Sequence, residues 1–151
     1  MTKTIRAIKI DALARTVEEI RLPVEPGNPE AGYGEQVIIE EFQKRLGCDH
    51  VEMLGLDYGN MMIVDGEALL NDDGQPRMFL QWGENGQPIA DGAIICGHIT
   101  STDTWCDTMI TVEEVKETVI LTLRKVRGTK VTKPQPGHIS IELVAPIIEE
   151  K

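Results

Sequence analysis

Aromatic residues are scarce in this chain, with two Trp, two Tyr and two Phe among 151 residues. Surfaces that bind single-stranded nucleic acid usually combine aromatic rings, on which bases stack, with basic side chains. Basic residues are also in the minority, because 15 Lys and Arg stand against 25 Asp and Glu, for a net charge of −10. Both shortages argue against a nucleic acid as the partner.

Long apolar runs are missing as well, since none approaches the ~20 residues that a membrane-spanning helix needs. The opening residues, MTKTIRAIKID, alternate in polarity where a signal peptide would have a continuous apolar stretch. We therefore expect a cytoplasmic protein with no membrane partner.

Cysteine is limited to Cys48, Cys96 and Cys106. An odd number leaves one thiol over in any disulfide scheme, and a cytoplasmic chain keeps its thiols reduced. We expect free cysteines, of which buried structural ones are the commonest kind.

The first half of the chain predicts two hairpins around a helix. Residues 4–11 and 16–22 alternate in polarity and form the first hairpin. Residues 35–48 have apolar residues at helical spacing and a stop at Gly47. Strands at 51–56 and 61–65, joined by the turn DYGN, form the second hairpin.

Several segments are harder to assign. The Pro- and Gly-rich stretch 23–34 predicts a long loop. RMFLQWG (77–83) is apolar but too short to distinguish a helix from a strand. The six bases of RKVRGTKVTK (124–133) are typical of a solvated helix end and loop, because cations suit a helix C-terminus.

The second half predicts a central strand, a helix and a last strand. AIICGHI (93–99) is β-branched and follows Pro and Gly, as a central strand does. Thr111 and Glu114 form a capping box for a helix at least through Glu117. Residues 119–126 fit the same helical face, yet TVILTL also suits a strand. Residues 138–146 alternate as a last strand.

This order of elements predicts an α+β fold, with a small, mainly antiparallel sheet and two helices in a single domain over residues 1–151. Residues 128–151 form an added C-terminal segment.

Three stretches in this order resemble an uncharacterised family of phage and plasmid proteins, domain of unknown function family 3846. They are IRAIKIDALARTVEEIRL, FQKRLGCDHVEMLGL with MMIVDGEALLN, and PIADGAIICGH. The resemblance covers roughly residues 4–115, and the chain departs from the family pattern in the 23–34 loop and beyond about residue 125. It implies a phage-encoded accessory protein in the host cytoplasm and brings no catalytic residues.

A metal site is one hypothesis for the richest stretch of the chain. Cys96 and His98 share one face of a strand, and Cys106 follows a loop that also holds Asp103. Three such ligands with Asp or water could hold zinc, but the usual paired-cysteine knuckle is missing. The alternative places Cys96 in the core and His98 at the strand edge with a hydrogen bond.

Enzyme chemistry finds little support. A cysteine nucleophile needs a lowered pKa, and Cys48 with His50 follows a helix C-terminus, the wrong dipole end for a thiolate. The chain contains no phosphate-binding loop, no G-x-S-x-G elbow and no H-E-x-x-H motif. We expect neither a catalytic residue nor a cofactor.

A binding function is the remaining hypothesis. A pocket for a small polar ligand needs an aromatic ring on which the ligand stacks, with hydroxyl groups around it. Tyr33 and Trp105 fall in polar stretches, and Trp105 lies within HITSTDTWCDT, which is rich in hydroxyls. The candidate ligand-binding residues are Tyr33, His98, Thr102, Asp103, Thr104 and Trp105. The alternative is a loop hydrogen-bonded to itself, with Trp105 folded back over the core.

We therefore expect a non-enzymatic accessory protein of a phage or mobile element that binds a small molecule as a homo-oligomer. The expected ligand is a nucleotide-like host defence signal, which the protein would sequester. The alternative is an acidic inhibitor or nucleic-acid mimic that acts on a host protein. A metal-dependent or cysteine-dependent enzyme is the third reading.

Overall fold

The computed structural model describes residues 3–32, 34–56, 58–68, 75–124, 126–131 and 139–143, the last two ranges as backbone strands. The elements are, in chain order, β1 (Thr4–Asp11), β2 (Thr16–Glu25), the 3₁₀ turn η1 (Pro29–Ala31), β3 (Gln36–Val37), α1 (Ile39–Leu46), β4 (Val51–Leu56), β5 (Asn60–Asp65), β6 (Arg77–Trp82), β7 (Ile89–Ala90), β8 (Gly92–Ile99), the 3₁₀ turn η2 (Thr100–Thr102), β9 (Thr104–Cys106), α2 (Val112–Thr118), β10 (Val119–Arg124), β11 (Val126–Val131) and β12 (Ile139–Leu143). The predicted α+β class is confirmed.

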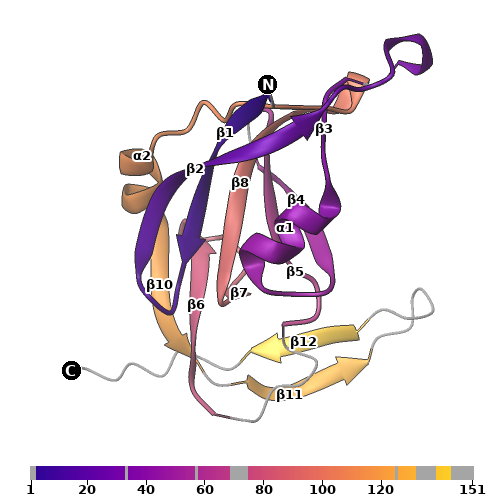
Figure 1. The fold of residues 1–151 in the computed structure, drawn as a ribbon. Coiled ribbons are helices and arrows are strands. Elements are labelled where there is room, and N and C mark those ends of the chain that lie inside the picture. The colour runs from indigo at the N-terminus through magenta and orange to yellow at the C-terminus, as the bar shows by residue number, and fades with distance from the viewer. Residues whose placement is uncertain are drawn as a thin grey trace.

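The main sheet has the strand order β3-β2-β1-β8-β5-β4, with β9 added to β8 (Figure 1). A smaller sheet has the order β10-β6-β7, and β11 pairs with β12. Every pairing is antiparallel. As the sequence predicts, residues 93–99 form a central strand, because β8 is hydrogen-bonded to both β1 and β5.

The central strands β1, β8 and β5 are largely buried on both faces, which explains the continuous apolar run in β8. On one face, Phe42 of α1 packs with Ile5 and Ala7 of β1. On the other face, Leu80 of β6 and Val115 of α2 pack against the remaining side chains of the central strands. Figure 1 shows α1 in front of the strands and β6, β10 and α2 along the opposite side.

Each of the two helices has one terminus that its sequence predicts. α1 stops at Gly47, which has φ of 68° and donates its N–H to the Gln43 carbonyl, as a C-cap glycine does. At the start of α2, the Thr111 side chain accepts a hydrogen bond from the Glu114 N–H, which confirms the predicted cap. Among the described residues, no helix is long and apolar enough to cross a membrane.

Three segments differ from the sequence-based expectations, two of them in the first half of the chain. The predicted loop 23–34 is shorter, because β2 continues through Glu25 and η1 interrupts the rest. The predicted helix 35–48 begins only at Ile39, since Gln36 and Val37 pair with β2 as strand β3.

The structure also assigns two segments of the second half that the sequence leaves undecided. Residues 77–82 form strand β6, and residues 119–124 form strand β10, which pairs with it. The β-branched run explains the strand at β10, because such side chains pack well on a pleated surface. The basic stretch 124–133 was expected to be a helix end and loop, but it contains strand β11.

Candidate functional site

The hydroxyl-rich stretch predicted to bind a ligand forms the β8–η2–β9 hairpin. Its threonine hydroxyls bond to each other, with 2.7 Å between the Thr102 and Thr104 Oγ1 atoms. The Thr104 hydroxyl also lies 3.3 Å from the Thr102 carbonyl. The hairpin therefore satisfies much of its own hydrogen bonding, which was the alternative reading of this stretch.

His98 and Asp103 form a pair inside this hairpin. The His98 Nε2 atom lies 2.9 Å from Asp103 Oδ1, and Asp103 adopts a left-handed conformation with φ of 45°. Because a carboxylate accepts, His98 Nε2 is the donor in this pair. The His98 side chain is only 10% exposed, and its buried Nδ1 has no partner among the described residues.

Trp105 is a core residue, and the expectation of an aromatic platform in a polar loop is wrong. The residue belongs to strand β9 and is 3% exposed. Its ring centroid lies 5.5 Å from that of Phe42 and 4.5 Å from that of His98. No base can stack on a ring whose faces are already covered. Tyr33, the other predicted aromatic contact, lies outside the described residues.

The three candidate zinc ligands do not converge. Cys96 is buried on the sheet face covered by α1, in the same cluster as Trp105. Cys106 pairs with Gly97, so its side chain lies on the opposite face from Cys96 and His98. No group of three metal-ligating side chains forms within the part of the chain that the structure describes.

The thiols have the wrong acidity for a nucleophile. Burial, with a smaller effect of Cys106, raises the pKa of Cys96 to about 12. Burial and the neighbouring Asp65 raise the pKa of Cys48, and burial and Asp107 raise that of Cys106. All three shifts oppose thiolate formation, which cysteine catalysis requires.

Arg6 organises the segment after β9, a role that sequence reasoning missed. Its guanidinium donates to the carbonyls of Thr108 (2.5 Å) and Ile110 (2.9 Å) and pairs with Glu19 at 2.5 Å. Its backbone N–H donates to the Asp107 carboxylate at 2.7 Å. One half-buried arginine thus fixes the path from β9 to α2. No local signal could have revealed this, because Asp107, Thr108 and Ile110 lie 101 to 104 residues from Arg6 in the chain.

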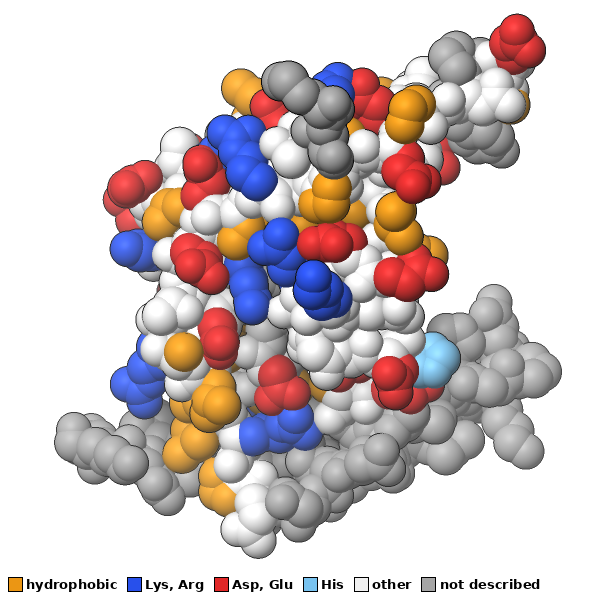
Figure 2. All heavy atoms as spheres, viewed as in Figure 1, with side chains coloured by type: hydrophobic (Ala, Val, Ile, Leu, Met, Phe, Trp, Pro, Cys, Tyr) orange, Lys and Arg blue, Asp and Glu red, His pale blue; other side chains and the backbone are white. Residues whose placement is uncertain are grey.

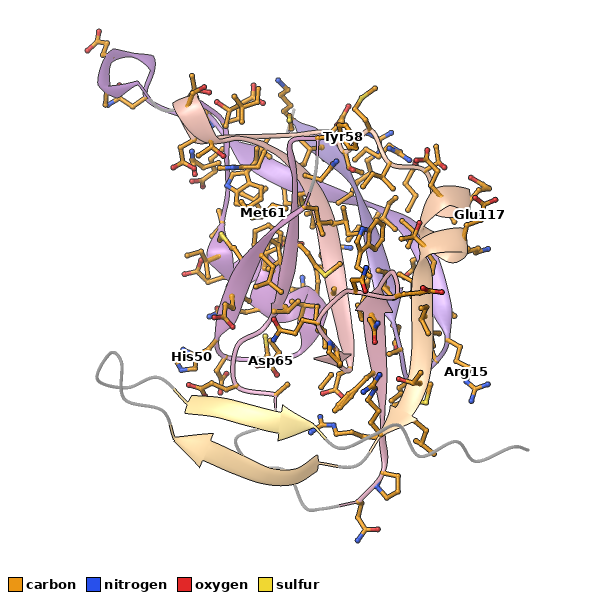
Figure 3. All side chains as sticks on the ribbon, turned by 180° about the vertical axis from the view of Figure 1, so that it is seen from behind. Arg15, His50, Tyr58, Met61, Asp65 and Glu117 are labelled. Carbon is orange, nitrogen blue, oxygen red and sulfur yellow. The ribbon has the colours of Figure 1, made fainter. Side chains whose placement is uncertain are left out.

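A cleft of about 220 Å³ opens at the other end of the main sheet, below the C-terminus of α1. Its lining comes from β1 and the turn after it, from the end of α1, from the end of β5 and from the start of β8: Lys9, Ile10, Asp11, Leu13, Arg45, Leu46, Gly47, Asp65, Asp91 and Gly92. Figure 3 shows Asp65 at this end of the sheet, level with Arg15 and far from Tyr58. None of these residues was predicted as a site.

Lys9 is the unusual group in the cleft. It lies on β1 between Ala7 and Asp11 on the face that α1 covers, where side chains further up the strand are buried. The Lys9 side chain makes no hydrogen bond or ion pair with any residue that the structure describes. Figure 2 shows acidic and basic side chains interspersed over the face formed by β2 and α1.

The other charges of the cleft are already engaged, at least in part. Arg45 pairs with Glu41 at 3.0 Å and donates to the Arg21 carbonyl. Asp91 pairs with Arg77 at 2.5 Å. Among the residues that the structure describes, the cleft therefore combines the unpaired Lys9 side chain with paired neighbours and two further carboxylates, Asp11 and Asp65.

Comparison of the chain with models of protein families, with curated proteins and with solved structures finds no match in any of the three. The resemblance to domain of unknown function family 3846 stays a prediction.

Proposed function

We propose that this protein acts by binding a small polar molecule in the cleft below α1, and that the anionic group of this ligand meets Lys9. The observation that carries the proposal is the Lys9 ammonium, which lines a cleft and has no partner among the described residues. Lys9 is half-buried and its ammonium has no counter-ion among the described residues, which is unfavourable, and an anion in the cleft would relieve that penalty.

The thiol chemistry supports a non-enzymatic role. Cysteine catalysis needs a thiolate, and the raised pKa values of Cys48, Cys96 and Cys106 oppose one. The Nδ1 atom of His98 is buried, so it is not accessible to a substrate.

A nucleotide-like signal remains one candidate ligand, because a phosphate would suit Lys9. Its base cannot stack on Trp105, so the binding mode expected from the sequence is replaced by contacts in the cleft. In this proposal the protein is an accessory protein of a phage or mobile element that sequesters its ligand, as a homo-oligomer, in the host cytoplasm.

Thermal melting of the wild type with inorganic phosphate, adenosine monophosphate and small carboxylates tests this function. Lys9→Met removes the charge and keeps the chain length, and Lys116→Met on the exposed surface of α2 is the matched control. We expect at least one anion to raise the melting temperature of the wild type and of Lys116→Met but not of Lys9→Met. Equal responses in all three proteins would contradict the proposal.

A protein-protein role is the second candidate, and one observation favours it. Tyr58 is 98% exposed and Met109 is 83% exposed, at the end of the sheet opposite the cleft, with the half-exposed Ile99. Exposed apolar side chains often mark an interaction surface. An inhibitor that docks through this surface would retain a host protein in a pull-down, and Tyr58→Ser with Met109→Ser would release it. Unchanged retention by the double variant would remove this candidate.

A further inference from the structure

The floor of the cleft is a glycine between two aspartates. Asp11 of β1 lies opposite Gly92 of β8, and continuing the β5–β8 register beyond the Val64–Ala93 pair brings Asp65 to the other side of Gly92. All three positions fall on the face that α1 covers. Because neighbouring strands lie about 4.8 Å apart, the two aspartate Cα atoms are separated by roughly 10 Å, with no side chain between them.

Gly92 cannot be replaced by a residue that fills this gap. A Cβ at this position would lie 2.5 Å from the Ile10 carbonyl oxygen, a distance that real Cβ atoms do not show. The close approach of β8 to β1 therefore requires glycine here, and the open floor follows from the backbone packing.

Each flanking carboxylate has one oxygen to spare. Asp11 Oδ1 accepts the Ala14 N–H at 3.0 Å, and Asp65 Oδ1 accepts the Glu67 N–H at 2.9 Å. These bonds hold both side chains in place at turns. The second oxygen of each has no hydrogen bond to any described residue, so each carboxylate can accept one more donor.

The end of α1 adds negative potential from above. Its last residues, Arg45 to Gly47, line the cleft, and the helix carbonyls at a C-terminus carry a partial negative charge. The Gln43 carbonyl accepts hydrogen bonds from the backbone N–H groups of Gly47 and Cys48. Two carboxylates below a helix C-terminus form a site that favours a cation such as an ammonium group.

Lys9 supplies a positive charge on the same face of β1, two residues before Asp11. Residues 9 and 11 are successive on the same face of β1, so their Cα atoms are roughly 6.7 Å apart. The cleft therefore has an anion-accepting group and a cation-accepting pair at a short, fixed separation.

From this arrangement we infer that the ligand is a zwitterion of about amino-acid size. Its acid group meets Lys9, and its ammonium group lies over Gly92 between Asp11 and Asp65. This inference rests on the proposed function and names its ligand class. The volume supports it, because pockets for drug-sized ligands measure roughly 300–1,000 Å³ and this cleft is about 220 Å³. A whole nucleotide would extend beyond the cleft.

Four probes of matched chain length test the ligand class: 4-aminobutyrate, butyrate, butylamine and the diamine putrescine. Titration calorimetry of the wild type should show 4-aminobutyrate binding at least tenfold more tightly than each of the other three. Asp65→Asn and Asp11→Asn keep the turn hydrogen bond but lose the charge, and each should weaken 4-aminobutyrate at least tenfold. Glu113→Gln, at an exposed position of α2, should bind like the wild type.

The outcomes separate this inference from the function on which it rests. Binding of phosphate or adenosine monophosphate that depends on Lys9, together with no binding of 4-aminobutyrate, would overturn the zwitterion and leave the proposed function standing. Tighter binding of putrescine than of 4-aminobutyrate would overturn it too, because Lys9 would then play no part. If no probe of either set binds the folded wild type, Lys9 only neutralises Asp11 and Asp65, and both proposals fail.

Discussion

The imidazole of His98 lies against the indole of Trp105, with 4.5 Å between the ring centroids. The two residues are direct cross-strand partners in β8 and β9, and Phe42 of α1 contacts the same indole. This packing ties the β8–β9 hairpin to the core below α1. It also explains why the stretch with the most suggestive residues is a structural element.

Replacement of Trp105 should therefore destabilise the protein. We expect Trp105→Ala to lower the free energy of unfolding by about 3–5 kcal/mol, as large-to-small changes of buried aromatic residues do. Met109→Ala, at an exposed position, should stay within about 0.5 kcal/mol. Urea unfolding measures both. Equal stability of Trp105→Ala and the wild type would show that the ring is not part of the core.

Arg6 should be needed for the path from β9 to α2. Arg6→Met removes two bonds to carbonyl groups and the pair with Glu19, so we expect a loss of about 2–3 kcal/mol. Arg6→Lys should recover little, because one ammonium cannot reproduce the fork of the guanidinium. Arg15, which points away from the protein in Figure 3, supplies the control Arg15→Met. Full rescue by lysine would argue against the fork geometry.

Gly97 should tolerate no side chain. A Cβ there would lie 2.4 Å from the Asp107 carbonyl oxygen, because the chain after β9 crosses directly over this residue. We expect Gly97→Ala to destabilise the protein by about 1–3 kcal/mol. Gly55→Ala is the matched control, since a Cβ at Gly55 meets nothing within 4 Å. A lower melting temperature for Gly55→Ala than for Gly97→Ala would contradict the close approach of the chain after β9 to Gly97.

The cysteines should react slowly in the native protein. Alkylation by iodoacetamide at neutral pH should modify Cys48 and Cys106 slowly, because their pKa values are raised, and Cys96 only after unfolding. Mass spectrometry of peptides reports each site separately. Fast modification of one thiol in the folded protein would revive a cysteine-dependent enzyme.

Cys96 also gives the stability a pH dependence with a definite sign. Its pKa is about 12 when folded and 9.0 ordinarily, so between these values the folded state holds the proton more tightly. The associated stability is fully present below pH 9 and falls by up to about 1.4 kcal/mol per pH unit as the pH rises towards 12. Cys96→Ala should lose less stability over this range. Parallel pH curves for the two proteins would contradict the burial of the thiol.

The sequence predicted the elements that depend on residues close together in the chain. Alternation identified both hairpins, Gly47 and the Thr111–Glu114 pair identified two helix ends, and the apolar run identified the central strand β8. The helix-to-strand change at Val119 was not decidable, because its β-branched run suits either state until β6 offers a partner.

The candidate site could not be predicted, because its residues meet only through strand register. Lys9, Asp11, Asp65 and Gly92 carry no shared motif, and three strands and a helix end bring them together. Trp105 was predicted to lie in a polar loop because of its neighbours in the sequence. Its neighbours in the sequence are polar, but they alternate along a strand and leave the indole on the buried face.

The most direct test of the cleft is a ¹⁵N chemical-shift titration of the wild type with 4-aminobutyrate, followed by inorganic phosphate. We expect the largest shifts at backbone amides that line the cleft, those of Lys9, Gly47, Asp65 and Gly92. Shifts centred on Asp103 to Trp105 would move the site back to the hairpin. A spectrum that neither probe changes would contradict the cleft as a binding site.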